Sequence, residues 1–125
     1  MTTEIATNEI SNYLSILKSM LKDDDTKLII KEDLVKNYTF KYLYNVNKHK
    51  IIGILLSLRE DEFYKKVVSN NSMHEGDILY IWNPIRLFTN ARGELCELRL
   101  YIKTYVNINN RMIVIISFHE FNDFS

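Results

Sequence analysis

Residues 94–120 read ELCELRLYIKTYVNINNRMIVIISFHE, and this stretch decides the fold. From residue 96 to residue 107 apolar and polar side chains alternate, which predicts a strand with one buried face. The second arm is apolar at nearly every position from Met112 to Ile116, as expected for a central strand that is covered on both faces. Residues 107–110 tolerate left-handed backbone, so the two arms are predicted to form an antiparallel hairpin. The predicted buried face of the first arm carries Cys96, Leu98, Leu100, Ile102, Thr104 and Val106.

The other face of the first arm presents a row of polar and aromatic side chains. Arg99, Tyr101 and Lys103 are two residues apart, so their side chains stand about 7 Å apart along one face. His119 closes the second arm. A turn with an odd number of residues would place His119 on the face of Tyr101, and a two-residue turn would place it opposite. Both arrangements remain open from the pattern.

The bulk properties favour an ordinary small domain. The 125 residues are enough for one domain with its own core, spanning residues 1–125. The formal net charge is zero, so any binding of nucleic acid needs a local cluster of Lys and Arg. No apolar run of about 18 residues and no signal-peptide pattern is present. The single cysteine, Cys96, excludes an internal disulfide, and a cytoplasmic protein without a membrane partner is expected.

The N-terminal half is predicted to be mainly helical. Thr7 or Asn8 can cap a helix whose apolar residues, from Ile10 to Leu21, recur at helical spacing. A short strand is predicted over 27–31, and the pattern over 32–45 fits either a helix or a strand. A second helix is predicted over 47–56. Ser57 and Glu60 then form a capping-box pattern, which predicts a third helix through residues 63–66.

The C-terminal half is predicted to be extended. Residues 77–82 read as a strand, and Pro84 indicates an edge or an irregular connection because proline cannot donate to a central ladder. Another strand is predicted over 85–88, closed by a turn over 89–93. Helices first and antiparallel strands last predict an α+β domain. Its N-terminal helices would pack on one face of a small, mainly antiparallel twisted sheet.

Lys, Arg, Tyr and His side chains without an acidic cluster suit metal-independent RNA cleavage. In that reaction the ribose 2′-hydroxyl attacks the adjacent phosphate, which needs a base, an acid and fixed cations. The required 2′-hydroxyl would make RNA the substrate. Tyr80 or Trp82 could stack an unpaired base. No glycine-rich phosphate loop, zinc-ligand spacing or nucleophile elbow is present, so no metal or cofactor is expected.

A plainer interpretation exists for each of these residues. An Arg-Tyr-Lys alternation is also typical of the solvated face of a half-buried strand. Lys65 would then be an exposed residue at a helix end, and His119 a surface histidine.

Three stretches in order resemble the MqsR toxins of bacterial toxin–antitoxin pairs, which are similar to the wider RelE-like group of ribonucleases. They are residues 51–65 (IIGILLSLREDEFYK), 77–84 (DILYIWNP), and the hairpin segments 100–103 (LYIK) and 114–118 (VIISF). The resemblance covers residues 47–120 and implies a RelE-like fold. It also implies an mRNA interferase, whose substrate is mRNA and whose partner is a cognate antitoxin protein.

Carried over by position, the resemblance implies catalytic roles for Lys65 and Tyr101 and places His119 where the family has a lysine. Histidine titrates nearest to neutral pH, so it can serve as an acid or a base at that position. Lys103, Arg99, Tyr80 and Trp82 are the candidate substrate-binding residues. The family's catalytic glutamine has no counterpart, because Gly76 precedes Asp77.

Two alternatives stand beside the ribonuclease. One is a non-catalytic protein-binding module on the same scaffold, such as a phage or mobile-element protein that docks a partner. The missing glutamine and the zero net charge favour it. The other is an α+β domain of a different family. Its hairpin would have a similar pattern because any half-buried strand alternates apolar and polar residues.

Overall fold

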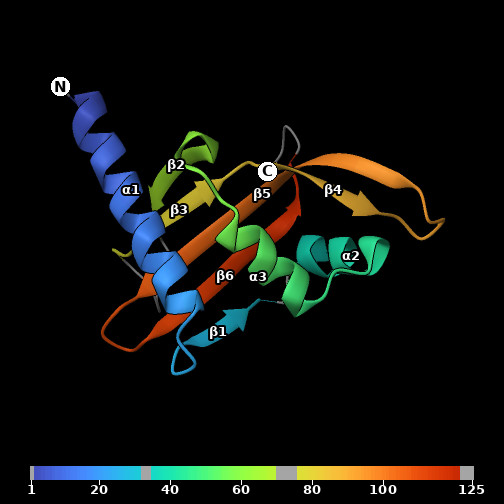
Figure 1. Ribbon diagram of the computed structural model, residues 1–125, viewed down its shortest axis with the longest axis horizontal. Coiled ribbons are helices and arrows are strands. Elements are labelled where there is room, and N and C mark those ends of the chain that lie inside the picture. The colour runs from blue at the N-terminus through green and yellow to red at the C-terminus, as the bar shows by residue number, and fades with distance from the viewer. Residues whose placement is uncertain (1, 32–34, 70–75, 122–125) are drawn as a thin grey trace.

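The computed structural model describes residues 2–31, 35–69 and 76–121, with side chains from residue 8 onward, and shows an α+β fold (Figure 1). The helices are α1 (Thr2–Leu21), α2 (Val35–Tyr44) and α3 (Lys48–Leu56), with a short 3-10 turn, η1 (Glu60–Glu62). The strands are β1 (Lys27–Ile30), β2 (Phe63–Val68), β3 (Ile78–Trp82), β4 (Ile85–Thr89), β5 (Leu95–Asn107) and β6 (Met112–Glu120).

The six strands form one mixed sheet in the order β1-β6-β5-β3-β2, and β4 continues alongside β5. The only parallel pair among the described strands is β1 with β6; the other pairs are antiparallel. Strand β5 is long enough to pair with β3 through Ile102–Thr104 and with β4 through Leu95–Arg99. The residues between β3 and β4 include Pro84, so the proline sits in an irregular connection, as predicted.

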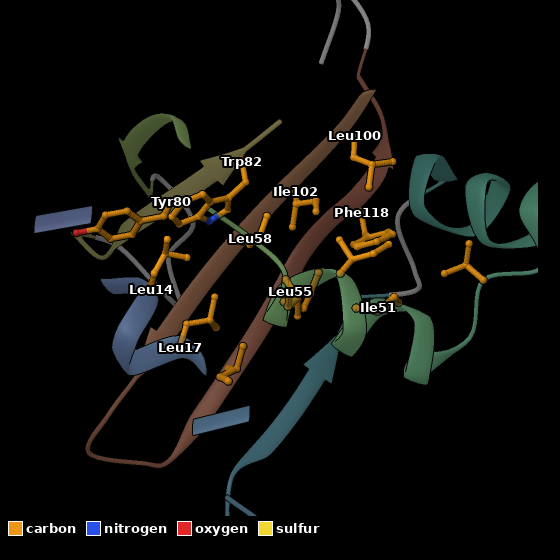
Figure 2. Packing of buried hydrophobic residues seen from close by; sticks show 14 of the residues in the cluster. Leu14, Leu17, Ile51, Leu55, Leu58, Tyr80, Trp82, Leu100, Ile102 and Phe118 are labelled. Carbon is orange, nitrogen blue, oxygen red and sulfur yellow. The ribbon is translucent and has the colours of Figure 1, made fainter. Parts of the chain in front are cut away.

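All three helices contribute to one core on one face of the sheet (Figure 2). Leu17 of α1, Leu55 of α3 and Phe40 of α2 pack with residues of the sheet such as Trp82 and Ile102. Burial of these large side chains is the main source of stability, at about 1.5–3 kcal/mol for each. The prediction of helices on one face of the sheet is therefore confirmed, and the hairpin face of Leu98, Leu100 and Ile102 is buried as predicted.

The helix predictions had mixed outcomes. The helix over 47–56 is confirmed as α3, and its N-cap Asn47 accepts a hydrogen bond from the backbone of Lys50. The ambiguous segment forms α2. The predicted third helix is wrong, because residues 63–68 form β2. Ser57 ends α3, where its hydroxyl donates to the Ile54 carbonyl.

Other differences concern boundaries. Helix α1 begins at Thr2, so neither Thr7 nor Asn8 caps it. The strand predictions over 27–31, 77–82 and 85–88 are confirmed by β1, β3 and β4. Residues 32–34 of the ambiguous segment lie outside the described residues, as do residues 70–75 and the tail after residue 121. Within the described part, no helix has the length and apolar character to cross a membrane.

A buried ion pair fixes η1, and with it the start of β2. Arg86 donates two hydrogen bonds to the Glu62 carboxylate, from Nη1 to Oε2 at 2.6 Å and from Nη2 to Oε1 at 2.8 Å. Only 19% of the Arg86 side chain and 8% of the Glu62 side chain are exposed. Burial by itself raises the pKa of Glu62, but the contact with Arg86 outweighs this and holds the pKa below its ordinary value.

We expect Arg86→Ala to lower the free energy of unfolding by about 2–4 kcal/mol, because the buried Glu62 carboxylate loses both hydrogen bonds to Arg86 and, among the described residues, keeps only the more distant guanidinium of Arg59 as a cation, at 3.6 Å. Arg111→Ala is the matched control. Arg111 pairs with Asp25 at 3.3 Å, but both side chains are largely exposed, so its removal should cost about 0–1 kcal/mol. Urea unfolding of both variants measures the difference, and equal losses would contradict the role of burial.

Candidate functional site

The sheet face opposite the three helices carries two neighbouring rows of polar and aromatic side chains. In the first row Lys65 of β2 pairs with Ile81 of β3, which pairs with Lys103 of β5. In the second row Tyr101 of β5 pairs with His119 of β6. The two rows are two residues apart along β5, which corresponds to about 7 Å. The fold therefore brings Lys65, Tyr101, Lys103 and His119 to one face.

Tyr101 and His119 lie against each other as a stacked pair. Their ring centroids are 5.3 Å apart with an interplanar angle of 15°. Each is only 6% exposed, so the plainer interpretation of a solvated strand face and a surface histidine is wrong for these two residues. The Phe121 ring contacts Tyr101 at 6.0 Å between centroids, and the Lys103 ammonium lies 5.9 Å from the centre of the Tyr101 ring.

A β-bulge places His119 on the face of Tyr101. The turn between β5 and β6 holds four residues, 108–111, and from this turn Asn107 pairs with Met112. Unbroken pairing from there would set Tyr101 opposite Phe118 and turn His119 to the core face. The register shifts by one residue at Ile116, so that Lys103 pairs with Ser117 and Tyr101 with His119. The simple odd-or-even rule for the turn therefore fails, because it ignores the bulge.

Asn37 of α2 holds the strand at this bulge. Its side-chain amide donates to the Ile116 carbonyl at 2.9 Å, and its oxygen accepts from the Phe118 amide at 2.9 Å. The same amide also donates to the Lys31 carbonyl at 2.7 Å. Strand β1 ends at Ile30, so the buried Asn37 side chain continues the hydrogen bonding along β6 where β1 stops.

Burial and nearby charges change the acidity of these groups. Burial raises the pKa of Tyr101, and the neighbouring Tyr64 adds to the rise. Burial lowers the pKa of Lys103, and the positive charge of Lys65 lowers it further. Burial also lowers the pKa of His119 and outweighs its backbone hydrogen bond. At neutral pH the site therefore holds a neutral imidazole, a protonated phenol and a lysine that gives up its proton more readily than usual.

The hydrogen bond of His119 fixes its tautomer. Nδ1 lies 2.9 Å from the Glu120 carbonyl oxygen, which can only accept, so Nδ1 carries the hydrogen. The lone pair is then on Nε2, which is free to take up a proton. Because Asn37 holds α2 against the edge of β6, His119 also lines a hollow of about 230 Å³ together with residues of α2, including Lys36, Thr39 and Leu43.

The lowered pKa of His119 predicts that the folded chain loses stability in acid. The unfolded chain binds a proton at a pH where the folded chain keeps His119 neutral, so acid favours unfolding. This part of the stability is complete above the ordinary histidine pKa of about 6.5 and is lost as the pH falls toward the lowered value. Urea unfolding at about pH 8 and about pH 5.5 should show a smaller loss for His119→Gln than for the wild type. His49→Gln, which removes an exposed histidine, is the matched control, and the same change in both variants would contradict the assignment.

Arg99 precedes Tyr101 by two residues on β5, but its side chain contacts other residues. Its Nη1 donates to the Asn83 carbonyl at 3.3 Å. It lines a hollow of about 250 Å³ that it shares with Arg59, Arg86 and Glu62. Arg99 is therefore on the surface, as predicted, but belongs to a separate group of side chains.

Tyr80 and Trp82 correct the prediction of base-stacking residues, because both point to the helix-covered face. The Trp82 ring is fully buried, and its Nε1 donates to the Thr104 hydroxyl at 3.3 Å. The Tyr80 ring stacks on Tyr13 with centroids 3.8 Å apart, and its hydroxyl donates to Glu9 at 2.8 Å. Their positions in β3 alternate with that of Ile81, which faces the candidate site.

Asn37 and the aromatic pair Tyr64–Phe121 were missed by the sequence reasoning. One signal for Asn37 was available: it precedes Phe40 by three residues and Tyr44 by seven, so it is a polar residue on the buried face of α2. Tyr64 and Phe121 meet edge to face at 5.3 Å, and no sequence signal linked them. Among the described residues no group of three or more His, Cys, Asp or Glu side chains is arranged to hold a metal ion.

Comparisons with protein-family models, curated proteins and solved structures find no match for this chain.

Proposed function

We propose that this protein is a metal-independent endoribonuclease with a RelE-like scaffold. The observation that carries the proposal is the convergence of Lys65, Tyr101, Lys103 and His119 on the sheet face opposite the helices. These residues come from three strands, and β2 is distant in sequence from the hairpin of β5 and β6. Two of the side chains are cations and one is a neutral histidine with a free ring nitrogen, which together match the needs of RNA cleavage by the 2′-hydroxyl.

Each group has a role in this reaction. His119 Nε2 takes the proton of the ribose 2′-hydroxyl as the 2′-oxygen forms a bond to phosphorus. The bond from phosphorus to the 5′-oxygen breaks, and this oxygen receives a proton from Lys103, whose lowered pKa suits an acid. Lys65 and Lys103 offset the charge on the phosphate, and the Tyr101 hydroxyl donates a hydrogen bond to it. The products are a 2′,3′-cyclic phosphate and a 5′-hydroxyl.

The biological setting follows from the sequence resemblance to MqsR toxins. We infer an mRNA interferase in the bacterial cytoplasm, held inactive by a cognate antitoxin protein. The replacement of the family's lysine by His119 supports a more direct acid–base role at that position, because histidine exchanges protons near neutral pH.

Induced expression in a bacterial host tests this function. Wild type is compared with His119→Ala, and His49→Ala serves as the control because His49 is exposed on α3. Growth arrest with new 5′ ends in cellular RNA, present for wild type and the control and absent for His119→Ala, supports the ribonuclease. Normal growth with intact RNA from folded protein would contradict it.

A non-catalytic binding module is the second candidate, and one observation favours it. Tyr101 and His119 are each 6% exposed; the hollow beside α2 reaches His119 but is not lined by Tyr101, so a substrate contacts the Tyr101 hydroxyl only after a local opening. In that case expression would be harmless, and His119→Ala would change neither growth nor RNA.

A further inference from the structure

Helix α2 has an outer face that is rich in exposed aromatic and aliphatic side chains. Tyr38 and Tyr42 are 62% and 78% exposed, and Val35 and Leu43 are 79% and 50% exposed. The opposite side of the same helix is fixed to the fold by the buried residue Phe40. Two exposed tyrosines one helical turn apart offer flat rings without a described neighbour stacked on them.

A hollow of about 330 Å³ lies at these tyrosines. It is lined by Tyr38, Lys41, Tyr42, Asn45 and Val46. Asn45 follows the helix in the left-handed conformation (φ 48°), and the next amide, that of Val46, donates to the Lys41 carbonyl at 3.0 Å. The hollow thus combines aromatic faces, a cation and a side-chain amide, which are the groups that bind an unpaired base and its phosphate.

The charge of this region favours a polyanion. From Val35 to Leu58 the sequence contains Lys36, Lys41, Lys48 and Lys50 and no Asp or Glu, so the segment has a formal charge of +4 while the whole chain has zero. A local excess of this kind is the clustering that a neutral chain needs to bind nucleic acid. A segment without acidic residues that also carries exposed aromatic rings is a better match for RNA than for an apolar helix of a protein, although Glu120 lines the neighbouring hollow at His119.

Helix α2 lines both the hollow at the tyrosines and the hollow at the candidate active site. The second hollow is lined by Thr39 and Leu43 of α2 and reaches His119. Thr39 follows Tyr38, and Leu43 follows Tyr42, so one helix lines both hollows. A strand of RNA that lies along α2 can therefore pass from the tyrosines to His119.

We propose that Tyr38 and Tyr42 form a platform for single-stranded RNA, on which unpaired bases next to the cleaved bond stack. This inference rests on the proposed ribonuclease function and adds its specificity-determining surface. Lys41 contacts the phosphate between the stacked bases, and Asn45 reads a base edge.

Binding of an RNA that cannot be cleaved tests the platform apart from the chemistry. The probe is a fluorescein-labelled, mixed-sequence 2′-O-methyl RNA of about 12 nucleotides, read by fluorescence anisotropy with the full chain. We expect Tyr38→Ala and Tyr42→Ala each to weaken binding about 5- to 100-fold, because each removes one stacked base. Tyr42→Phe keeps the ring and should keep most of the affinity. Leu87→Ala and Leu95→Ala, at exposed apolar residues of β4 and β5, are matched controls and should bind as wild type does.

The outcomes separate the platform from the ribonuclease. Wild-type affinity in both tyrosine variants, or equal losses in the leucine controls, would overturn the platform, even where the matching all-ribose RNA is still cut. A wild-type chain that neither binds the probe nor cuts the all-ribose RNA would overturn both proposals. Weakened binding in the tyrosine variants alone, with circular dichroism unchanged, supports the platform.

Discussion

Tyr101→Phe is expected to lower the rate of RNA cleavage about 100- to 1,000-fold, because it removes one hydrogen-bond donor to the phosphate in the transition state. The ring that stacks on His119 remains, and among the described residues the Tyr101 hydroxyl has no hydrogen-bond partner to lose. The free energy of unfolding should therefore change by less than about 1 kcal/mol. Single-turnover cleavage of an RNA oligonucleotide and urea unfolding measure the two effects.

Tyr105→Phe is the matched control for this substitution. Tyr105 lies on the same strand, four residues farther along and outside the two rows at the site. It is expected to retain cleavage within a few-fold of wild type. Full cleavage by Tyr101→Phe, or an equal loss in both variants, would contradict the role of Tyr101.

Asn37→Ala is expected to have the second largest effect, on stability and on activity together. It leaves the Ile116 carbonyl and the Phe118 amide without their partner, at a cost of about 2–4 kcal/mol in the free energy of unfolding. It also releases the bulge that keeps His119 opposite Tyr101. A one-residue slip would turn His119 toward the core face, so cleavage should fall even at temperatures where the variant is folded.

Asn47→Ala separates stability from positioning. Asn47 caps α3, and its loss should cost about 1 kcal/mol without a change at the sheet face opposite the helices. Cleavage per folded molecule should therefore be normal in Asn47→Ala and reduced in Asn37→Ala. Equal cleavage by the two folded variants would show that Asn37 has only a structural role.

The sequence allowed the core of the fold to be predicted where its patterns were strong and local. The alternation over β5 identified the buried face, and the Asn47 cap with Ile51, Ile54 and Leu55 identified α3. The prediction failed at residues 63–66, because the capping-box pattern at Ser57 is local and weak. Pairing with β3 instead makes this segment an edge strand.

The site was predicted as a set of residues but not as a geometry. Lys65, Tyr101, Lys103 and His119 do converge, yet His119 reaches the face of Tyr101 only because of the bulge at Ile116. A bulge depends on contacts with a distant helix, here Asn37, and these leave no mark in the periodicity of the strand itself. The base-stacking role was assigned to Tyr80 and Trp82 because the sequence pattern does not show which face of this strand the helices cover. Their neighbours on α1 then bury them.

Cleavage by the purified chain in the presence of a chelator is the most direct test of the ribonuclease. An all-ribose oligonucleotide that contains a mapped cleavage site is compared with the same oligonucleotide carrying a single 2′-deoxy sugar at that site. We expect cleavage of the first with a 2′,3′-cyclic phosphate at the new end, and none of the second, because the attacking oxygen is missing. Cleavage of the 2′-deoxy substrate, or no cleavage of either by folded wild-type protein, would contradict the assignment of this site.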